Sequence, residues 1–162
     1  MKEHMVLQEM MVQKVRIYSI ALMQMRMWNF VRAMRCFFHD QIRYIVVNEF
    51  QKDLNGITTI AEASQLHQEL VKKLYRRCLL GQKHVMLWNV LDDCLILIAR
   101  YRHSAKSFNV LTLFKIFDDF HNNVDLFCNA VKMASAGANY WLSDLLLLAD
   151  FTSIYIDLHD SS

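Results

Sequence analysis

Histidines, cysteines and carboxylates are the side chains of this sequence that could bind a metal ion or catalyse a reaction. The chain has seven His, four Cys and 16 Asp or Glu among 162 residues. Asp118 and His121 would share one helix face, as metal ligands do in helical bundles. Such a bundle needs matching ligands on a facing helix, and no Glu-x-x-His sequence is present to supply them. We therefore expect neither a metal site nor a cofactor.

Nucleophilic catalysis has no better support in the sequence. Cys78 and His67 resemble a thiol and its base, but eleven residues of helix would separate them by about 16 Å. The three Gly form no Gly-x-Ser-x-Gly or phosphate-binding motif. We interpret Cys78 and His67 as packing positions, and the pairs Asp92-Asp93 and Asp118-Asp119 as solvated. The chain is expected not to be an enzyme.

The elements that would position these side chains are helices. The sequence has no Pro, and its glycines, Gly56, Gly81 and Gly137, stand where helical periodicity stops. We predict an all-α fold, an elongated bundle of about five long helices in a single domain over residues 1–162. The cysteines form no Cys-x-x-Cys pair, which favours a reduced intracellular protein. Apolar runs are far shorter than the roughly 20 residues of a membrane span, so we expect no membrane partner.

The first predicted helix runs from Val6 to Phe50 and would be about 65 Å long. Its apolar residues recur every three or four positions, which predicts a buried stripe. The stripe consists of Met10, Ile17, Ala21, Trp28, Val31, Met34, Phe38, Ile42 and Ile45.

The later helices have recognisable start and stop signals. Thr59 and Glu62 form a predicted capping box, and Gly81 fits a left-handed residue after the second helix. The third helix is expected from Lys83 to His103, while Ser107 and Asn139 would cap the fourth and fifth. The stripes expected inward are Ala63, Leu66, Leu70, Leu74 and Cys78; Trp88, Leu91, Leu95 and Ile98; Leu111, Phe114, Phe117, Val124, Phe127 and Val131; and Trp141, Leu145, Leu148, Phe151 and Tyr155.

Charge is distributed unevenly along the chain. Residues 1–106 hold 16 Lys and Arg against 9 Asp and Glu, whereas residues 107–162 hold 2 against 7. The net charge is therefore +7 for the first part and −5 for the second. This asymmetry could orient a partner, or it could arise by chance. Arginines on the first helix alternate with aromatic residues, so a nucleic-acid-binding module is one interpretation. A solvated basic face or a dock for an acidic protein is the other. The arginines are Arg16, Arg26, Arg32, Arg35 and Arg43.

Two groups of residues carry a resemblance to a known family. Met34, Phe37 and Phe38 share one predicted helix, and His67 precedes Cys78-Leu79-Leu80 in the next. This spacing resembles the carboxy-terminal region of the gamma-tubulin complex protein family. The segment from Leu145 to Tyr155 is similar to the closing signature of that family, although Leu148 stands for its usual Arg and Thr152 for its Asn. The resemblance covers about residues 18–155. Within the first helix, His39-Asp40 replaces a common Asn-Asn pair and Gln41 replaces a Leu.

The resemblance implies a component of the gamma-tubulin complex that binds gamma-tubulin and supports microtubule nucleation. Gamma-tubulin and other complex components would be its partners. Its location would be the cytoplasm and cytoskeleton, at a microtubule-organising centre such as a centrosome or spindle pole. Family members use an amino-terminal half for lateral contacts; this sequence covers only the last part of the carboxy-terminal half, so lateral assembly should be missing.

Charge placement suggests which residues would meet an acidic partner. The candidates are Arg32, Arg35 and Arg43 on the first helix, and Arg76 and Arg77 at the end of the second. The family-like residues Met34, Phe37, Tyr44, Cys78, Leu79 and Phe151 are interpreted as core.

Overall fold

The computed structural model describes residues 2–107, 109–135 and 137–147, and every regular element in them is helical. The elements are α1 (Lys2–Arg43), a π-helical segment (Tyr44–Phe50), α2 (Gln51–Leu54), α3 (Ile60–Arg77), a 3-10 turn (Gln82–His84), α4 (Val85–Ala105), α5 (Val110–Ala134) and a second 3-10 segment (Gly137–Leu142). The predicted all-α fold is confirmed.

The number of long helices is four rather than five in the described residues. The chain after α5 begins as a 3-10 segment because Asn139 adopts a non-helical backbone conformation, with φ −105° and ψ 30°. Residues 143–147 continue as helix. The predicted stripe positions Leu148, Phe151 and Tyr155 lie outside the described residues.

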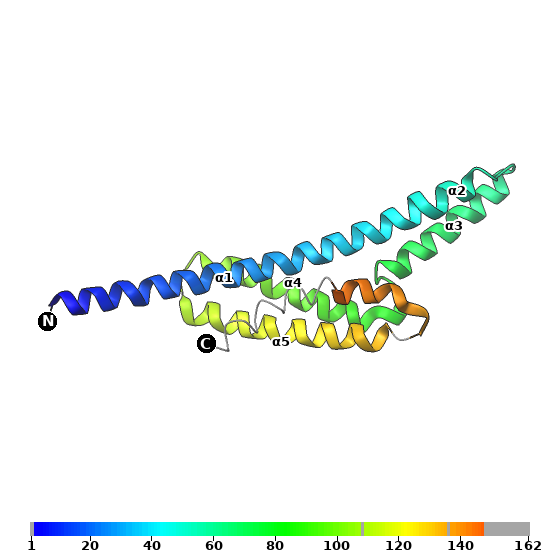
Figure 1. The fold of residues 1–162 in the computed structure, drawn as a ribbon. Helices are drawn as coiled ribbons and strands as arrows, with labels where there is room; N and C mark the ends of the chain where they lie inside the picture. Colours follow the sequence, from blue (N-terminus) through cyan, green and yellow to red (C-terminus); the bar gives the residue numbers. More distant parts are fainter. Residues whose placement is uncertain (1, 108, 136, 148–162) are drawn as a thin grey trace.

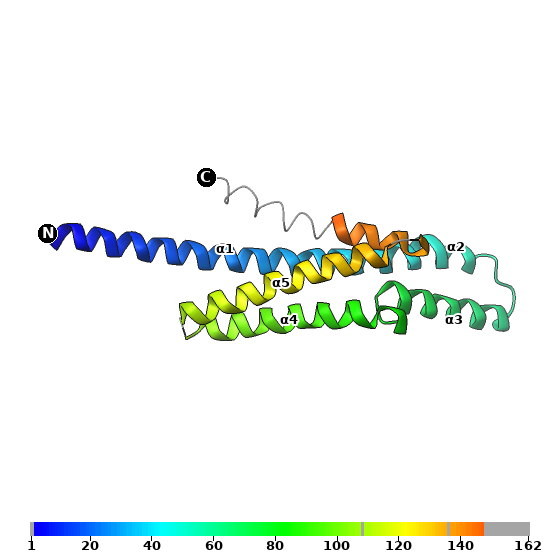
Figure 2. The same cartoon turned by 90° about the horizontal axis from the view of Figure 1, so that it is seen from below.

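The fold is built along one continuous helical rod. α1, the π-helical segment and α2 follow one another from Lys2 to Leu54 without a break, as the sequence predicted. α4 and α5 form an antiparallel pair against the middle of this rod (Figures 1 and 2). The amino-terminal part of α1 extends past the pair at one end, and the hairpin of α2 and α3 extends past it at the other. The molecule is therefore elongated.

Aromatic residues of α1 contact α5 and the second 3-10 segment. The ring of Phe30 meets Phe120 and Phe127 edge-on, with ring centroids 5.5 and 6.1 Å apart. Phe37 stacks on Trp141 at 6.0 Å. These pairs contribute about 0.5–1.5 kcal/mol each beyond their buried area. The Tyr101 hydroxyl of α4 also donates a hydrogen bond to the Ile20 carbonyl at 3.2 Å, which ties α4 to α1.

The buried face of α1 differs from the stripe predicted by the sequence. Met10, Ile17, Ala21, Trp28 and Ile42 are exposed, and Val31 and Phe38 are half-buried. Only Met34 and Ile45 of that stripe are buried. Residues 10–18 are exposed on every side, because this part of α1 extends past the helix pair (Figure 1). Further along, α1 is apolar on both sides, so periodicity alone did not select the buried one. The core residues are Met23, Met27, Phe30, Ala33, Met34, Phe37 and Ile45.

Similar corrections apply to the other stripes. α3 packs mainly on the rod, so its predicted stripe is half-buried and none of its residues is fully buried. Trp88 and Leu95 of α4 are exposed, as are Leu111 and Phe114 of α5. The residues that fill the core instead are Leu87, Cys94, Leu97 and Tyr101 of α4 and Leu113 and Phe120 of α5. The predicted Leu91, Val124, Phe127 and Val131 are buried, and Ile98 and Phe117 are half-buried.

The helix caps were predicted with mixed success. The Thr59–Glu62 capping box is present: each side chain accepts a hydrogen bond from the backbone N–H of the other residue. Asn109, not Ser107, caps α5 by accepting from the Thr112 N–H at 3.3 Å. Asn139 lies at the kink where two helical stretches meet, but the hydrogen bond of its side chain is directed backwards: Nδ2 donates to the Ala134 carbonyl at the end of α5, at 3.2 Å.

The end of α3 places a leucine in the left-handed conformation. Leu79 has φ 62°, while Gly81 has φ −74°, so the predicted left-handed glycine is wrong. The Leu80 N–H donates to the Tyr75 carbonyl and the Leu79 N–H to the Arg76 carbonyl, which is the Schellman pattern. Leu79 accepts the left-handed strain because its side chain is fully buried.

This arrangement predicts an unusual order of stability between two variants. Leu79→Ala should cost about 2–5 kcal/mol of unfolding free energy because a buried side chain is lost. Leu79→Gly should be at least as stable as Leu79→Ala, because glycine also relieves about 1–2 kcal/mol of left-handed strain. Urea denaturation measures the difference. Leu87 lies in regular helix and serves as the control: Leu87→Gly should be about 1 kcal/mol less stable than Leu87→Ala. If Leu79→Gly were likewise less stable than Leu79→Ala, this account would be contradicted.

Candidate protein-binding surface

Three of the candidate arginines form one exposed row on α1. Arg32, Arg35 and Arg43 follow spacings of three and eight residues, and His39 lies between the last two. At about 100° per residue these positions share one side of the helix, opposite Phe30 and Phe37. All four are exposed. The row is thus available to a partner while the far side of α1 holds the core.

The remaining two arginines lie at the end of α3. Arg76 is exposed, whereas Arg77 is half-buried and already engaged. Its Nη1 donates to Gln41 Oε1 at 3.0 Å, and its guanidinium lies 5.2 Å from the centre of the Trp141 ring. Arg77 therefore joins α3, α1 and the second 3-10 segment. Whether it also meets a partner stays a prediction.

The five candidates form two groups rather than a single cluster. The Arg77–Gln41 bond places the end of α3 beside α1, two residues before Arg43. However, Gln41 is buried, and Arg43 is turned about 200° around the helix from it. A partner that contacts both groups must therefore reach around α1.

The family-like residues are mostly in the core, as predicted. Met34, Phe37 and Leu79 are buried, and Cys78 is half-buried. Tyr44 is half exposed, so its assignment to the core was wrong. His67 is exposed and is not a packing position. Phe151 lies outside the described residues.

Sequence reasoning missed the contact between Gln41 and Arg77. A signal was present, because Gln41 interrupts an apolar helix face where the resemblance places a Leu. A buried amide is costly unless it has a hydrogen-bond partner. The Arg77 guanidinium supplies that partner from another helix, a pairing that one sequence cannot reveal.

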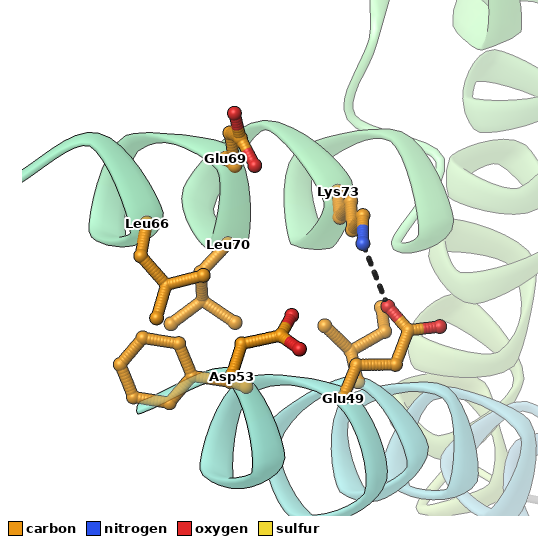
Figure 3. Close-up of a pocket in the computed structure, with 8 residues that line it drawn as sticks. Glu49, Asp53, Leu66, Glu69, Leu70 and Lys73 are labelled. Atoms are coloured by element: carbon orange, nitrogen blue, oxygen red, sulfur yellow. Dashed lines mark hydrogen bonds and ion pairs between the residues drawn. The ribbon is translucent and has the colours of Figure 1, made fainter. Parts of the chain in front are cut away.

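A small cavity separates α3 from the π-helical segment and α2 (Figure 3). It encloses about 20 Å³, which is enough for one water molecule. Lys73 Nζ forms an ion pair with Glu49 Oε2 at 2.9 Å across it. Asp53 is directed into the space between the helices, and Glu69 is directed away from it. The cavity lies within the packing contact between the two arms of the hairpin and has no room for an organic ligand.

Groups capable of chemistry are separated or held in unreactive forms in the described part of the chain. No three His, Cys, Asp or Glu residues come together there in a way that could hold a metal ion. Burial, with help from Asp93, raises the pKa of the Cys94 thiol to about 12, and burial also raises the pKa of Cys78. His121 lies 3.7 Å from Asp125, not in a shared site with Asp118. With their raised pKa values, the Cys94 and Cys78 thiols remain protonated near neutral pH and are poor nucleophiles.

The described residues also contain no helix that combines the length and apolarity needed to cross a bilayer. Fold and surface together define the class: an elongated, all-helical protein with one exposed row of arginines on α1.

Comparison with known protein families gives the identity of that protein. Residues 2–155 match the family model described as gamma tubulin complex component C-terminal. The chain therefore belongs to the gamma-tubulin complex component family, of which it contains the carboxy-terminal region. The match begins earlier than the resemblance found from motifs and includes all of α1. No curated protein and no solved structure matches the chain.

The buried His84 gives a pH-dependent test of the packing around Trp141. Its ring meets Trp141 edge-on at 5.8 Å. Burial, followed by the charges of Arg76 and Lys83, lowers the pKa of His84 from 6.5. As the pH falls through 6.5, His84 becomes protonated in the unfolded chain before it does so in the folded chain, and this favours the unfolded state. Stability should therefore fall as the pH drops from about 7.5 to about 5.5.

The control is His84→Phe, which keeps an aromatic ring beside Trp141 but cannot titrate. Chemical denaturation at several pH values should give a smaller loss of stability on acidification for this variant. The other histidines are common to both proteins and cancel in the comparison. Equal losses in the two proteins would contradict the assignment.

Proposed function

We propose that this chain binds gamma-tubulin as part of the gamma-tubulin complex and supports microtubule nucleation at microtubule-organising centres. The observation that carries the proposal is the match to the family over residues 2–155. Gamma-tubulin and other components of the complex are the proposed partners. The proposed location is the cytoplasmic cytoskeleton, at a centrosome or spindle pole.

The proposed mechanism is docking between preformed surfaces, with no reaction carried out by this chain. Nucleation would follow from holding gamma-tubulin in a fixed orientation, because pre-ordering reduces the entropy lost on assembly. The surface offered to an acidic partner is the row of Arg32, Arg35 and Arg43, with Arg76 in the separate group at the end of α3. Arg77 would act mainly by fixing the end of α3, since its guanidinium is already bound to Gln41.

Long-range charge supports this choice of surface. No carboxylate of the described residues forms an ion pair with Arg32, Arg35, Arg43 or Arg76, so their positive charge is not neutralised locally. Exposed charges of this kind accelerate association and orient the partner more than they add affinity. Binding should therefore weaken as salt is raised.

The test is capture of purified gamma-tubulin by the folded chain at low and high salt. We expect capture at low salt, and Arg35→Glu combined with Arg43→Glu should weaken it about tenfold, or about 1.4 kcal/mol. The matched control is Lys115→Glu with Lys132→Glu, which changes the net charge equally on the exposed side of α5. No capture by a folded, helical sample would refute gamma-tubulin binding. Equal weakening by both double variants would refute the assignment to the α1 row.

Nucleic-acid binding is the second candidate function. The observation that favours it is exposure of Trp28 and Tyr44 near the arginine row, since exposed aromatic rings can stack on bases. Against it, Phe30 and Phe37 between the arginines are buried. Binding of single-stranded RNA or DNA with a steep salt dependence would support this candidate.

A further inference from the structure

An open groove lies between α1 and the carboxy-terminal half of α4, and it encloses about 590 Å³. Trp28 and Val31 line it from α1, and Ile98 and Tyr101 line it from α4. Arg102 and Lys106 form its edge on the α4 side. The groove is thus mainly apolar with a basic edge. Its lining includes none of the five arginines of the proposed gamma-tubulin surface.

One large apolar residue of the lining, Trp28, is exposed where a helix would ordinarily bury it. Trp28 is 66% exposed although it lies in the middle of α1. Val31 and Ile98 beside it are half-buried, whereas Tyr101 is buried. The uncovered apolar surface of the groove is therefore centred on Trp28.

The basic edge of the groove also lacks a partner of opposite charge. Arg102 and Lys106 are exposed, and no carboxylate of the described chain forms an ion pair with either. An occupant with Asp or Glu beside an apolar face would satisfy both features. The open trough between two neighbouring helices suits a third helix, because side chains of that helix fit between those of the first two.

We infer that this groove binds an amphipathic helix of another protein, one with large apolar side chains on one face and acidic residues beside them. The apolar face covers Trp28, Val31 and Ile98, and the acidic residues face Arg102 and Lys106. This is a helix-in-groove mode of recognition. The inference concerns a second partner and does not depend on gamma-tubulin binding.

The test uses designed fluorescent peptides of about three heptads. One carries Leu on a single helix face with Glu beside it, the second replaces Glu with Lys, and the third scatters the Leu residues. Fluorescence anisotropy with the whole chain should show binding of the Glu peptide, at least tenfold weaker binding of the Lys peptide and none of the scattered peptide. Equal affinity for the Glu and Lys peptides, or no binding of the Glu peptide, overturns the inference.

Two variants assign the binding to the groove. Arg102→Glu with Lys106→Glu should reverse the preference, so that the Lys peptide binds about tenfold more tightly than the Glu peptide. Trp28→Ala should weaken the binding of both peptides. The melting temperature of this variant should stay near that of the parent protein, because the Trp28 ring is exposed. Lys115→Glu with Lys132→Glu is the control and should keep the original preference. An unchanged preference in the Arg102 and Lys106 variant rejects the groove.

A second copy of the chain is the competing occupant. Sedimentation of the chain alone should show a monomer at the concentration of the peptide assay. A dimer that Trp28→Ala dissociates would assign the groove to self-association and overturn the inference.

Discussion

Burial along one side of α1 is the constraint on which the rest of the structure depends. Phe30 packs against two rings of α5, and Phe37 stacks on Trp141. The same rod then continues through the π-helical segment to hold α3 by the Glu49–Lys73 ion pair and the Arg77–Gln41 hydrogen bond. α3 has no fully buried residue of its own. Because α3 and the α4–α5 pair both pack on α1, the orientation of that rod determines which of its residues remain exposed.

That orientation also explains what could be predicted from the sequence. The scarcity of Pro and Gly identified the helical class and the unbroken rod, and Thr59 with Glu62 identified the start of α3. The buried side of α1 could not be identified, because Trp28 and Ile42 on one side are as apolar as Met27 and Phe30 on the other. Only the position of the α4–α5 pair decides between them. The Gln41–Arg77 contact and the left-handed Leu79 likewise depend on residues brought together by folding.

The exposed side of α1 gives the domain its proposed role. Arg32, Arg35 and Arg43 form a basic row there, and Trp28 lies beside the groove shared with α4. Burial raises the pKa of the Cys78 and Cys94 thiols, and no three His, Cys, Asp or Glu residues of the described chain come together in a way that could hold a metal ion. The proposed role of this exposed side rests on membership in the gamma-tubulin complex component family.

Methionine oxidation of the free chain tests the division most directly, because α1 carries methionines on both faces. Met11 and Met25 are exposed, whereas Met23, Met27 and Met34 are buried. Brief exposure to hydroxyl radicals, followed by peptide mass spectrometry, reports the accessibility of each. The account predicts rapid oxidation of Met11 and Met25 and protection of Met23, Met27 and Met34. Protection of Met25 together with rapid oxidation of Met27 and Met34 would show that α1 packs through its other face, and would contradict the account.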